Sequence, residues 1–153
     1  TGITMNNGML WFDPEPNRPN SIAPGKRPLC NICPVVVAKD GKPWFCIGAS
    51  GGRRIVPAVA QLSLMLIDRG LDVEAAFHQP RIDVSGVGPI RVNRELPDDV
   101  KQAIATKLPI VEVANQVSPM GFANPCCIVR DPTTGELTGM NEVMSPWAGG
   151  AAQ

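Results

Sequence analysis

Six prolines crowd the stretch from Asp13 to Pro34, and they constrain the fold of this 153-residue chain more than any other feature. They stand at positions 14, 16, 19, 24, 28 and 34. Proline lacks a backbone N–H and fixes φ, so neither a helix nor a central strand can run through this stretch. A loop this long inside a compact chain is uncommon unless it is functional or disordered. We therefore expect a long irregular segment, preceded by a short strand over residues 3–7.

The residues after this loop predict a strand, a turn, a second strand and a helix. Residues 35–37 and 44–47 are β-rich runs, and the Asp-Gly pair between them suits a hairpin turn. A glycine-rich segment over residues 48–52 follows, and residues 55–69 then form a helix with proline in its first turn and glycine after its end. Apolar residues wrap more than one side of this helix, so we expect it to be buried between layers.

The second half of the chain predicts a mixture of short helices and strands. We expect helices over residues 73–77 and 97–108, and strands near residues 81–84, 90–93, 110–113, 126–130 and 137–140. Strand pairs and helix pairs come in blocks, which favours an α+β layered sandwich over alternating βαβ units. The length suits one ordinary domain.

Charge and hydropathy exclude several classes of partner. The chain has 14 Lys and Arg against 14 Asp and Glu, so no global field attracts nucleic acid or anionic lipid. No apolar run approaches the ~18 residues that span a bilayer, and the N-terminus lacks a basic start with an apolar signal core. We expect a soluble protein that binds neither nucleic acid nor membrane. The missing initiator methionine indicates a processed or truncated product, so secretion of a longer precursor stays open.

Five cysteines are an odd number, and Cys126 and Cys127 are adjacent, so a complete set of intrachain disulfides cannot form. This slightly favours a cytoplasmic location, with a periplasmic or secreted one left open. Cys30 and Cys33 have the spacing of half a zinc site or of a redox pair, but Pro34 follows at once and the other cysteines lack chelating spacing. We expect no metal site and interpret the cysteines as small core residues.

The glycine-rich segment over residues 48–52 is the strongest candidate for chemistry, with two interpretations. Its backbone N–H groups could converge on an anion at a helix N-terminus, or its glycines could simply permit a sharp turn. Neither the Walker nor the dinucleotide-binding glycine pattern is present, which disfavours a phosphate loop. His78 is the only histidine, and without a nucleophile motif elsewhere we interpret it as structural or exposed. Trp44 is interpreted as a core residue.

A series of motifs runs in order through the first half of the chain. It comprises Asn6-Asn7-Gly8-Met9, Phe12-Asp13-Pro14, Pro19-Asn20-Ser21-Ile22, Pro24-Gly25-Lys26-Arg27-Pro28-Leu29, Gly51-Gly52-Arg53-Arg54-Ile55, Asp68-Arg69-Gly70 and Pro80-Arg81. Together these motifs resemble the small subunit of γ-glutamyltranspeptidase-like enzymes, which are N-terminal-nucleophile hydrolases. The resemblance implies an α-β-β-α sandwich that is incomplete without a large subunit. It also implies that residues 1–153 are the small-subunit portion of a single domain.

The resemblance further implies autoproteolysis and acyl transfer. In such enzymes an internal peptide bond is self-cleaved, and the new N-terminal threonine attacks an amide with its own α-amine as base. In the family the nucleophile precedes a Gly-Ile-x-x-Asn-Asn segment, which matches Gly2 to Asn7 here. Thr1 therefore matches a loop position, and we expect the attacking threonine upstream of this chain. The alternative is that Thr1 itself is the nucleophile. Gly51 and Gly52 match the pair whose N–H groups form the oxyanion hole.

The residues implied to bind substrate depart from the family pattern. Gly8 stands where the family has Gln or Glu, and Trp11 stands where it has Asp; both family residues hold the α-ammonium of the donor. Cys30 and Asn31 correspond to paired serines that hold its α-carboxylate. A zwitterionic glutamyl group should therefore bind poorly to this chain.

The expected function is cleavage of a γ-glutamyl or related small amide, with hydrolysis favoured over transpeptidation. Asp13 and Arg54 are candidates to compensate for the missing binding groups. The implied partner is the large subunit of the same precursor, and no cofactor is implied. The alternative is a catalytically silent family member, or a fragment, that acts as a binding or structural subunit.

Overall fold

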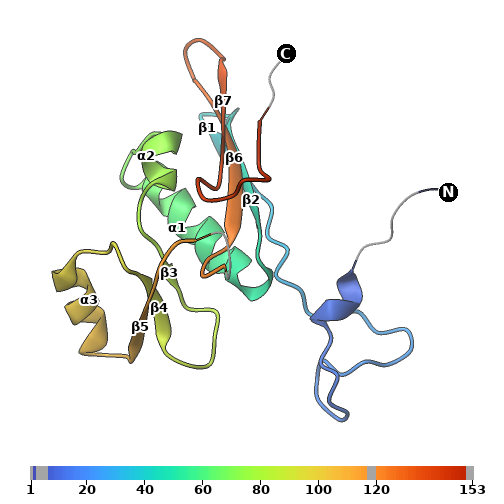
Figure 1. Ribbon diagram of the computed structural model, residues 1–153. Helices are drawn as coiled ribbons and strands as arrows, with labels where there is room; N and C mark the ends of the chain where they lie inside the picture. The colour runs from blue at the N-terminus through green and yellow to red at the C-terminus, as the bar shows by residue number, and fades with distance from the viewer. Residues whose placement is uncertain (1, 3–6, 117–119, 151–153) are drawn as a thin grey trace. The chain divides into compact units, whose positions relative to one another are not determined.

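The computed structural model describes Gly2 and residues 7–116 and 120–150 (Figure 1). The chain divides into two units, Thr1–Asn31 and Ile32–Gln153. Thr1 and most of the strand predicted over residues 3–7 lie outside the described residues.

The first unit is an irregular chain held together by polar contacts. It begins with the 3-10 turn η1 (Gly8–Trp11), and residues 12–31 continue in turns, bends and loop. The Asn20 side chain holds two parts of this loop together. Its Nδ2 donates to the Trp11 carbonyl at 2.6 Å, and its Oδ1 accepts from the Leu29 N–H at 2.9 Å. The irregular segment predicted from the prolines is confirmed.

The second unit is built on a four-stranded antiparallel sheet in the order β1-β2-β6-β7. Its strands are β1 (Val35–Lys39), β2 (Lys42–Ser50), β6 (Asn124–Arg130) and β7 (Leu137–Asn141). β1 and β2 form the predicted hairpin, and β6 reaches β2 after a long excursion through the rest of the chain. β2 is therefore a central strand, and its pairing with β6 extends to its last residue, Ser50.

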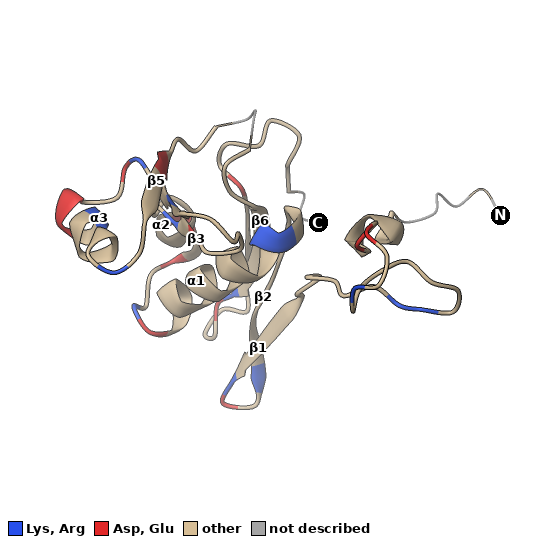
Figure 2. Ribbon diagram, turned by 90° about the horizontal axis from the view of Figure 1, so that it is seen from below, with Lys and Arg blue, Asp and Glu red and all other residues tan. Residues whose placement is uncertain are grey.

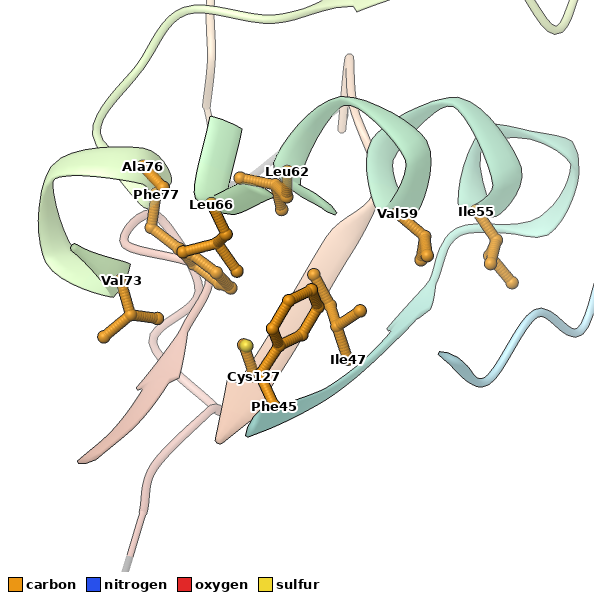
Figure 3. Close-up of a cluster of buried hydrophobic side chains, with 10 residues drawn as sticks. All are labelled: Phe45, Ile47, Ile55, Val59, Leu62, Leu66, Val73, Ala76, Phe77 and Cys127. Atoms are coloured by element: carbon orange, nitrogen blue, oxygen red, sulfur yellow. The ribbon is translucent and has the colours of Figure 1, made fainter. Parts of the chain in front are cut away.

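Side chains alternate across this sheet, and two helices cover one face (Figure 1). α1 (Ile55–Ile67) and α2 (Val73–Phe77) pack their apolar sides onto it. Figure 3 shows Val59, Leu62 and Leu66 of the helical layer facing Phe45 and Ile47 of β2. Burial of such side chains stabilises the fold by roughly 1.5–3 kcal/mol each.

The opposite face of the sheet carries exposed apolar side chains. Register places Val36 opposite Cys46, and Cys46 opposite Ile128, so these three side chains share one face. Val36 is 77% exposed and Ile128 is 48% exposed, and Cys46 is exposed as well.

The expectation that α1 is buried on all sides is wrong for the described residues. Its inner side is buried, but Val56, Leu64 and Ile67 are exposed by 44%, 54% and 46%. A helix packed on a single sheet face buries one stripe only, which is what the chain provides here. No helix formed by the described residues is long and apolar enough to cross a membrane.

A second, three-stranded sheet in the order β3-β4-β5 follows α2. Its strands are β3 (Ile82–Asp83), β4 (Ile90–Asn93) and β5 (Ile110–Val113). β3 and β4 pair antiparallel, while β4 and β5 pair parallel across α3 (Asp98–Ala105), whose acidic start is red in Figure 2. The predicted α+β class, with helices and strands in blocks, is confirmed.

Candidate active site

Gly51 and Gly52 form a tight turn between the end of β2 and the start of α1. Gly51 has φ 148° and ψ 19°, and Gly52 has φ 61°; both values favour glycine. A Cβ on Gly51 would lie 2.8 Å from both Cα and Cβ of the buried Ala123. Ala123 lies there because Ser50 of β2 pairs with Asn124 of the antiparallel strand β6. The residue after Ser50, which is Gly51, therefore lies opposite the residue before Asn124, which is Ala123. Backbone conformation and backbone approach both require glycine at position 51.

The N–H groups of this turn are placed where a helix begins. The 3-10 turn η2 (Gly52–Arg54) runs directly into α1, and the first N–H groups of a helix lack acceptors within it. In the described part of the chain, no hydrogen bond from the Gly51 or Gly52 N–H to a backbone or side-chain acceptor is found. Such a turn can donate to an oxyanion or carboxylate. Gly51 is partly buried and Gly52 is exposed.

The predicted glycine-rich loop is shorter in the structure than in the sequence analysis. β2 continues through Gly48 and Ala49 to Ser50, because these residues pair with Cys126, Pro125 and Asn124 of β6. Only the final two glycines form the turn, and this strand pairing is what holds it in place.

Arg54 connects this turn to two distant segments, a role that the sequence did not reveal. Its Nη1 donates to the Met120 carbonyl at 2.9 Å, and its Nε lies 3.5 Å from Oδ2 of Asp83 on β3. The Asp83 side chain is only 2% exposed and also pairs with Arg91 at 3.2 Å. Its Oδ1 accepts from the Ser85 N–H at 3.0 Å. Arg54 is thus engaged within the chain, and so is Asp13, which pairs with Arg18 at 3.2 Å.

A second ion pair lies beneath the same region. Arg81, directly before β3, pairs with Glu142, directly after β7, and both side chains are almost fully buried. Asn115 also donates to Glu142 at 3.0 Å. This buried pair ties the three-stranded sheet to the last strand of the four-stranded sheet. Among the described residues, Arg81 Nη1 is a buried donor without a hydrogen-bond acceptor.

The residues predicted to bind substrate belong to the first unit. Gly8 and Trp11 lie in η1, and Cys30 and Asn31 follow the segment that Asn20 links to Trp11. Asn20 thus links Trp11 to Leu29, the residue before Cys30. Gly51 and Gly52 belong to the second unit, so a common pocket for the two groups stays a prediction.

The expectation that the cysteines are core residues is confirmed for Cys127 and in part for Cys33, which packs against the core, and it is wrong for the other three. Cys30, Cys46 and Cys126 are exposed, Cys33 is half-buried, and all are free thiols. Burial, with smaller contributions from Cys46 and Cys126, raises the pKa of the Cys127 thiol to about 12. β2 and β6 present alternate residues to opposite faces, which explains why adjacent cysteines differ in exposure.

The interpretation of His78 as structural or exposed is confirmed, and that of Trp44 as a core residue is confirmed in part. His78 is exposed and follows α2, where its Nδ1 lies 2.8 Å from the Glu74 carbonyl. Trp44 is half-buried and packs at the edge of the core. It also lines a groove of about 280 Å³ with Leu66, Val73 and Val129. This groove lies at the other end of β2 from Gly51, so it is separate from the glycine turn.

Comparison with known proteins adds an independent result. The sequence profile of the γ-glutamyltranspeptidase family matches residues 1–152. An acylase proenzyme, ACY 1 of Pseudomonas sp. strain V22, is 36% identical over 107 residues, 70% of this chain and 19% of its own length. The glutathione hydrolase proenzyme of Bacillus subtilis strain 168 is 32% identical over 139 residues, 91% of this chain and 23% of its own length.

The fold is similar as well. A crystal structure of an acivicin-inhibited γ-glutamyltranspeptidase superposes with a TM-score of 0.79 at 26% identity. The match covers 95% of this chain and 82% of that chain. The chain therefore spans about a fifth of the two proenzymes but most of the crystallised chain. It corresponds to a C-terminal part, and the fold expected from the sequence is confirmed.

Proposed function

Because this chain belongs to the γ-glutamyltranspeptidase family, we propose that residues 1–153 are the small-subunit portion of one domain in an amidohydrolase that acts on a γ-glutamyl or related amide. The observation that carries this proposal is the Gly51–Gly52 turn, whose N–H groups begin a helix and whose conformation only glycine adopts readily. Preorganised N–H donors of this kind stabilise the charge that develops on a carbonyl under attack.

The proposed reaction is acyl transfer to a threonine that lies N-terminal to this chain in the precursor. The threonine Oγ forms a bond to the amide carbon while its α-amine takes the hydroxyl proton. Gly51 and Gly52 donate to the resulting oxyanion. The carbon–nitrogen bond then breaks, and the proton passes to the leaving amine. Water attacks the ester in the second half, releases the acid and restores the threonine.

The proposed partner is the large subunit of the same precursor. The sheet face that carries Val36, Cys46 and Ile128 is apolar and uncovered in this chain. Sheets pack face to face about 10 Å apart in sandwiches. A partner sheet on this face completes the α-β-β-α sandwich and buries these side chains.

The proposed acyl specificity is altered, and hydrolysis is favoured over transpeptidation. Gly8 and Trp11 carry no charge or amide that could hold an α-ammonium, and Cys30 and Asn31 offer a weaker set of donors than two hydroxyls. Arg54 and Asp13 are already paired, so they do not replace these groups. That one similar protein is called an acylase agrees with this view.

The test uses the mature enzyme made from the full precursor. Turnover is compared for γ-glutamyl-p-nitroanilide and for glutaryl-p-nitroanilide, which lacks only the α-ammonium. We expect faster turnover of the glutaryl compound; transpeptidase-level turnover of the γ-glutamyl compound contradicts the altered specificity. Mass spectrometry after treatment with electrophilic analogues of both acyl groups should show one adduct on the N-terminal threonine. No turnover and no adduct would favour the catalytically silent alternative, which the loss of donor-binding groups at positions 8 and 11 permits.

A further inference from the structure

Arg54 stabilises the glycine turn through a hydrogen bond from its backbone N–H and through the contacts of its side chain. Its N–H donates to the Gly51 carbonyl at 3.2 Å, which closes the turn from the helix side. Its guanidinium donates to the Met120 carbonyl at 2.9 Å, directly before the buried residues 121–123. Ala123 of that segment packs against Gly51. A single residue therefore holds the turn and the chain against which the turn packs.

The guanidinium is itself held in place by a buried carboxylate. Asp83 is 2% exposed at its side chain, and Arg54 Nε lies 3.5 Å from its Oδ2. A carboxylate removed from water needs charged partners and hydrogen bonds, so it pulls its partner arginine into a fixed position. The Arg54 side chain is 29% exposed, which leaves one of its sides open to solvent. The planar guanidinium pairs with Asp83 through Nε and donates to Met120 through Nη1, a fixed arrangement of donors that the ammonium of lysine does not reproduce.

Arg91 offers a matched comparison, because it pairs with the same Asp83 oxygen at 3.2 Å from β4. Within residues 7–116 and 120–150, no hydrogen bond or ion pair links the Arg91 side chain to the glycine turn. Removing either arginine costs Asp83 one cation. Only the removal of Arg54 also releases the Met120 segment.

We propose that Arg54 is a positioning residue for the oxyanion-binding turn, and that buried Asp83 fixes the orientation of its guanidinium. This inference rests on the proposed function of Gly51 and Gly52. Arg54 acts through the backbone of the turn, so its loss displaces the N–H donors and not the groups that bind the acyl chain. Small displacements of catalytic groups reduce rate strongly, and the loss should appear in kcat.

The experiment compares mature enzymes that carry Arg54→Ala and Arg91→Ala, using the anilide that the wild type turns over faster. We expect Arg54→Ala to lower kcat by about 10- to 100-fold with KM within about 3-fold of wild type. Arg91→Ala should change kcat by less than about 3-fold. The rate of adduct formation on the threonine should fall in parallel with kcat. Equal kcat values for the two variants, or a change confined to KM, overturn the inference.

If Arg54→Ala does not fold or mature, a second pair of variants, Arg54→Lys and Arg91→Lys, tests the same inference. Arg54→Lys keeps the charge but not the two-sided contact, and we expect its kcat to fall at least about 5-fold. Arg91→Lys should stay close to wild type, and equal kcat for the two lysine variants overturns the inference. A wild-type enzyme that shows neither turnover nor adduct contradicts the proposed function itself. Failure of the positioning role, by contrast, leaves the wild type active and its adduct intact.

Discussion

Gly51 and Gly52 are adjacent, but they are glycine for different reasons. At Gly51 a side chain meets the Ala123 backbone, and φ is 148°; at Gly52, φ is 61° and the space around a Cβ is open. We expect Gly51→Ala to lower kcat by ~10² or more, because the donors must move. Gly52→Ala should cost about 1 kcal/mol of stability, the ordinary penalty of the left-handed conformation. Melting temperature and kcat of the mature enzymes separate the two effects, and a Gly51→Ala variant as active as Gly52→Ala contradicts this account.

Cys127 makes stability depend on pH in the alkaline range. Its pKa rises from an ordinary 9.0 to about 12 in the fold, chiefly because burial disfavours the thiolate. The folded state therefore keeps a proton that the unfolded state loses. This contribution to stability is fully present below pH 9 and is lost as pH rises from 9 towards 12, by up to ~1.4 kcal/mol per pH unit.

The measurement is the urea midpoint of the mature enzyme between pH 8 and pH 11, for wild type and for Cys127→Ala. The variant leaves a small cavity, which shifts its stability by a similar amount at every pH. We expect a steeper alkaline loss in wild type than in the variant. Parallel curves would show that Cys127 titrates normally in the fold.

At the scale of elements, the buried pair of Arg81 and Glu142 joins the two sheets. Removing one partner of a buried ion pair leaves an uncompensated charge and costs roughly 3–5 kcal/mol. Glu142→Ala should be severe, since Arg81 already has one buried nitrogen without an acceptor in the described chain. Arg18→Ala breaks the exposed pair with Asp13 and should cost at most about 1 kcal/mol. Denaturation midpoints of the mature variants check this, and similar losses for both would contradict it.

Local sequence patterns were enough to predict most elements, but not the contacts between them. The hairpin, α2, β4 and β5 follow from short-range periodicity and turn residues, and the structure has them where predicted. The extension of β2 through Gly48 to Ser50 depends on pairing with β6, which no local pattern encodes. The same holds for Arg54, whose partner Met120 lies 66 residues away. The local sequence around Arg54 does not indicate which carboxylate or which carbonyl its side chain binds.

At the scale of the whole molecule, exposed apolar surfaces on α1 and on the four-stranded sheet are the basis for the proposed partner. The sequence suggested that α1 is buried on every side because its composition is apolar all round, yet only one stripe of it is covered here. The exposed stripe of α1 is a second apolar surface that the proposed large subunit would bury. The uncovered sheet face has the same character, since Val36, Cys46 and Ile128 lie side by side on it.

The sheet face that carries Val36 and Ile128 is the proposed contact with the large subunit. Val36→Asp or Ile128→Asp places a charge where the proposed large subunit packs, and burial of an unpaired carboxylate is strongly unfavourable. We expect both variants to lose association of the two subunits in gel filtration, with activity falling in proportion to the remaining complex. Val87→Asp is the matched control, because Val87 is fully exposed in the loop between β3 and β4. The intrinsic stability of the fold should change least for Val36→Asp and Val87→Asp, because Val36 is 77% exposed and Val87 is fully exposed, whereas Ile128 is 48% exposed. Normal association of Val36→Asp and Ile128→Asp would place the partner on another surface.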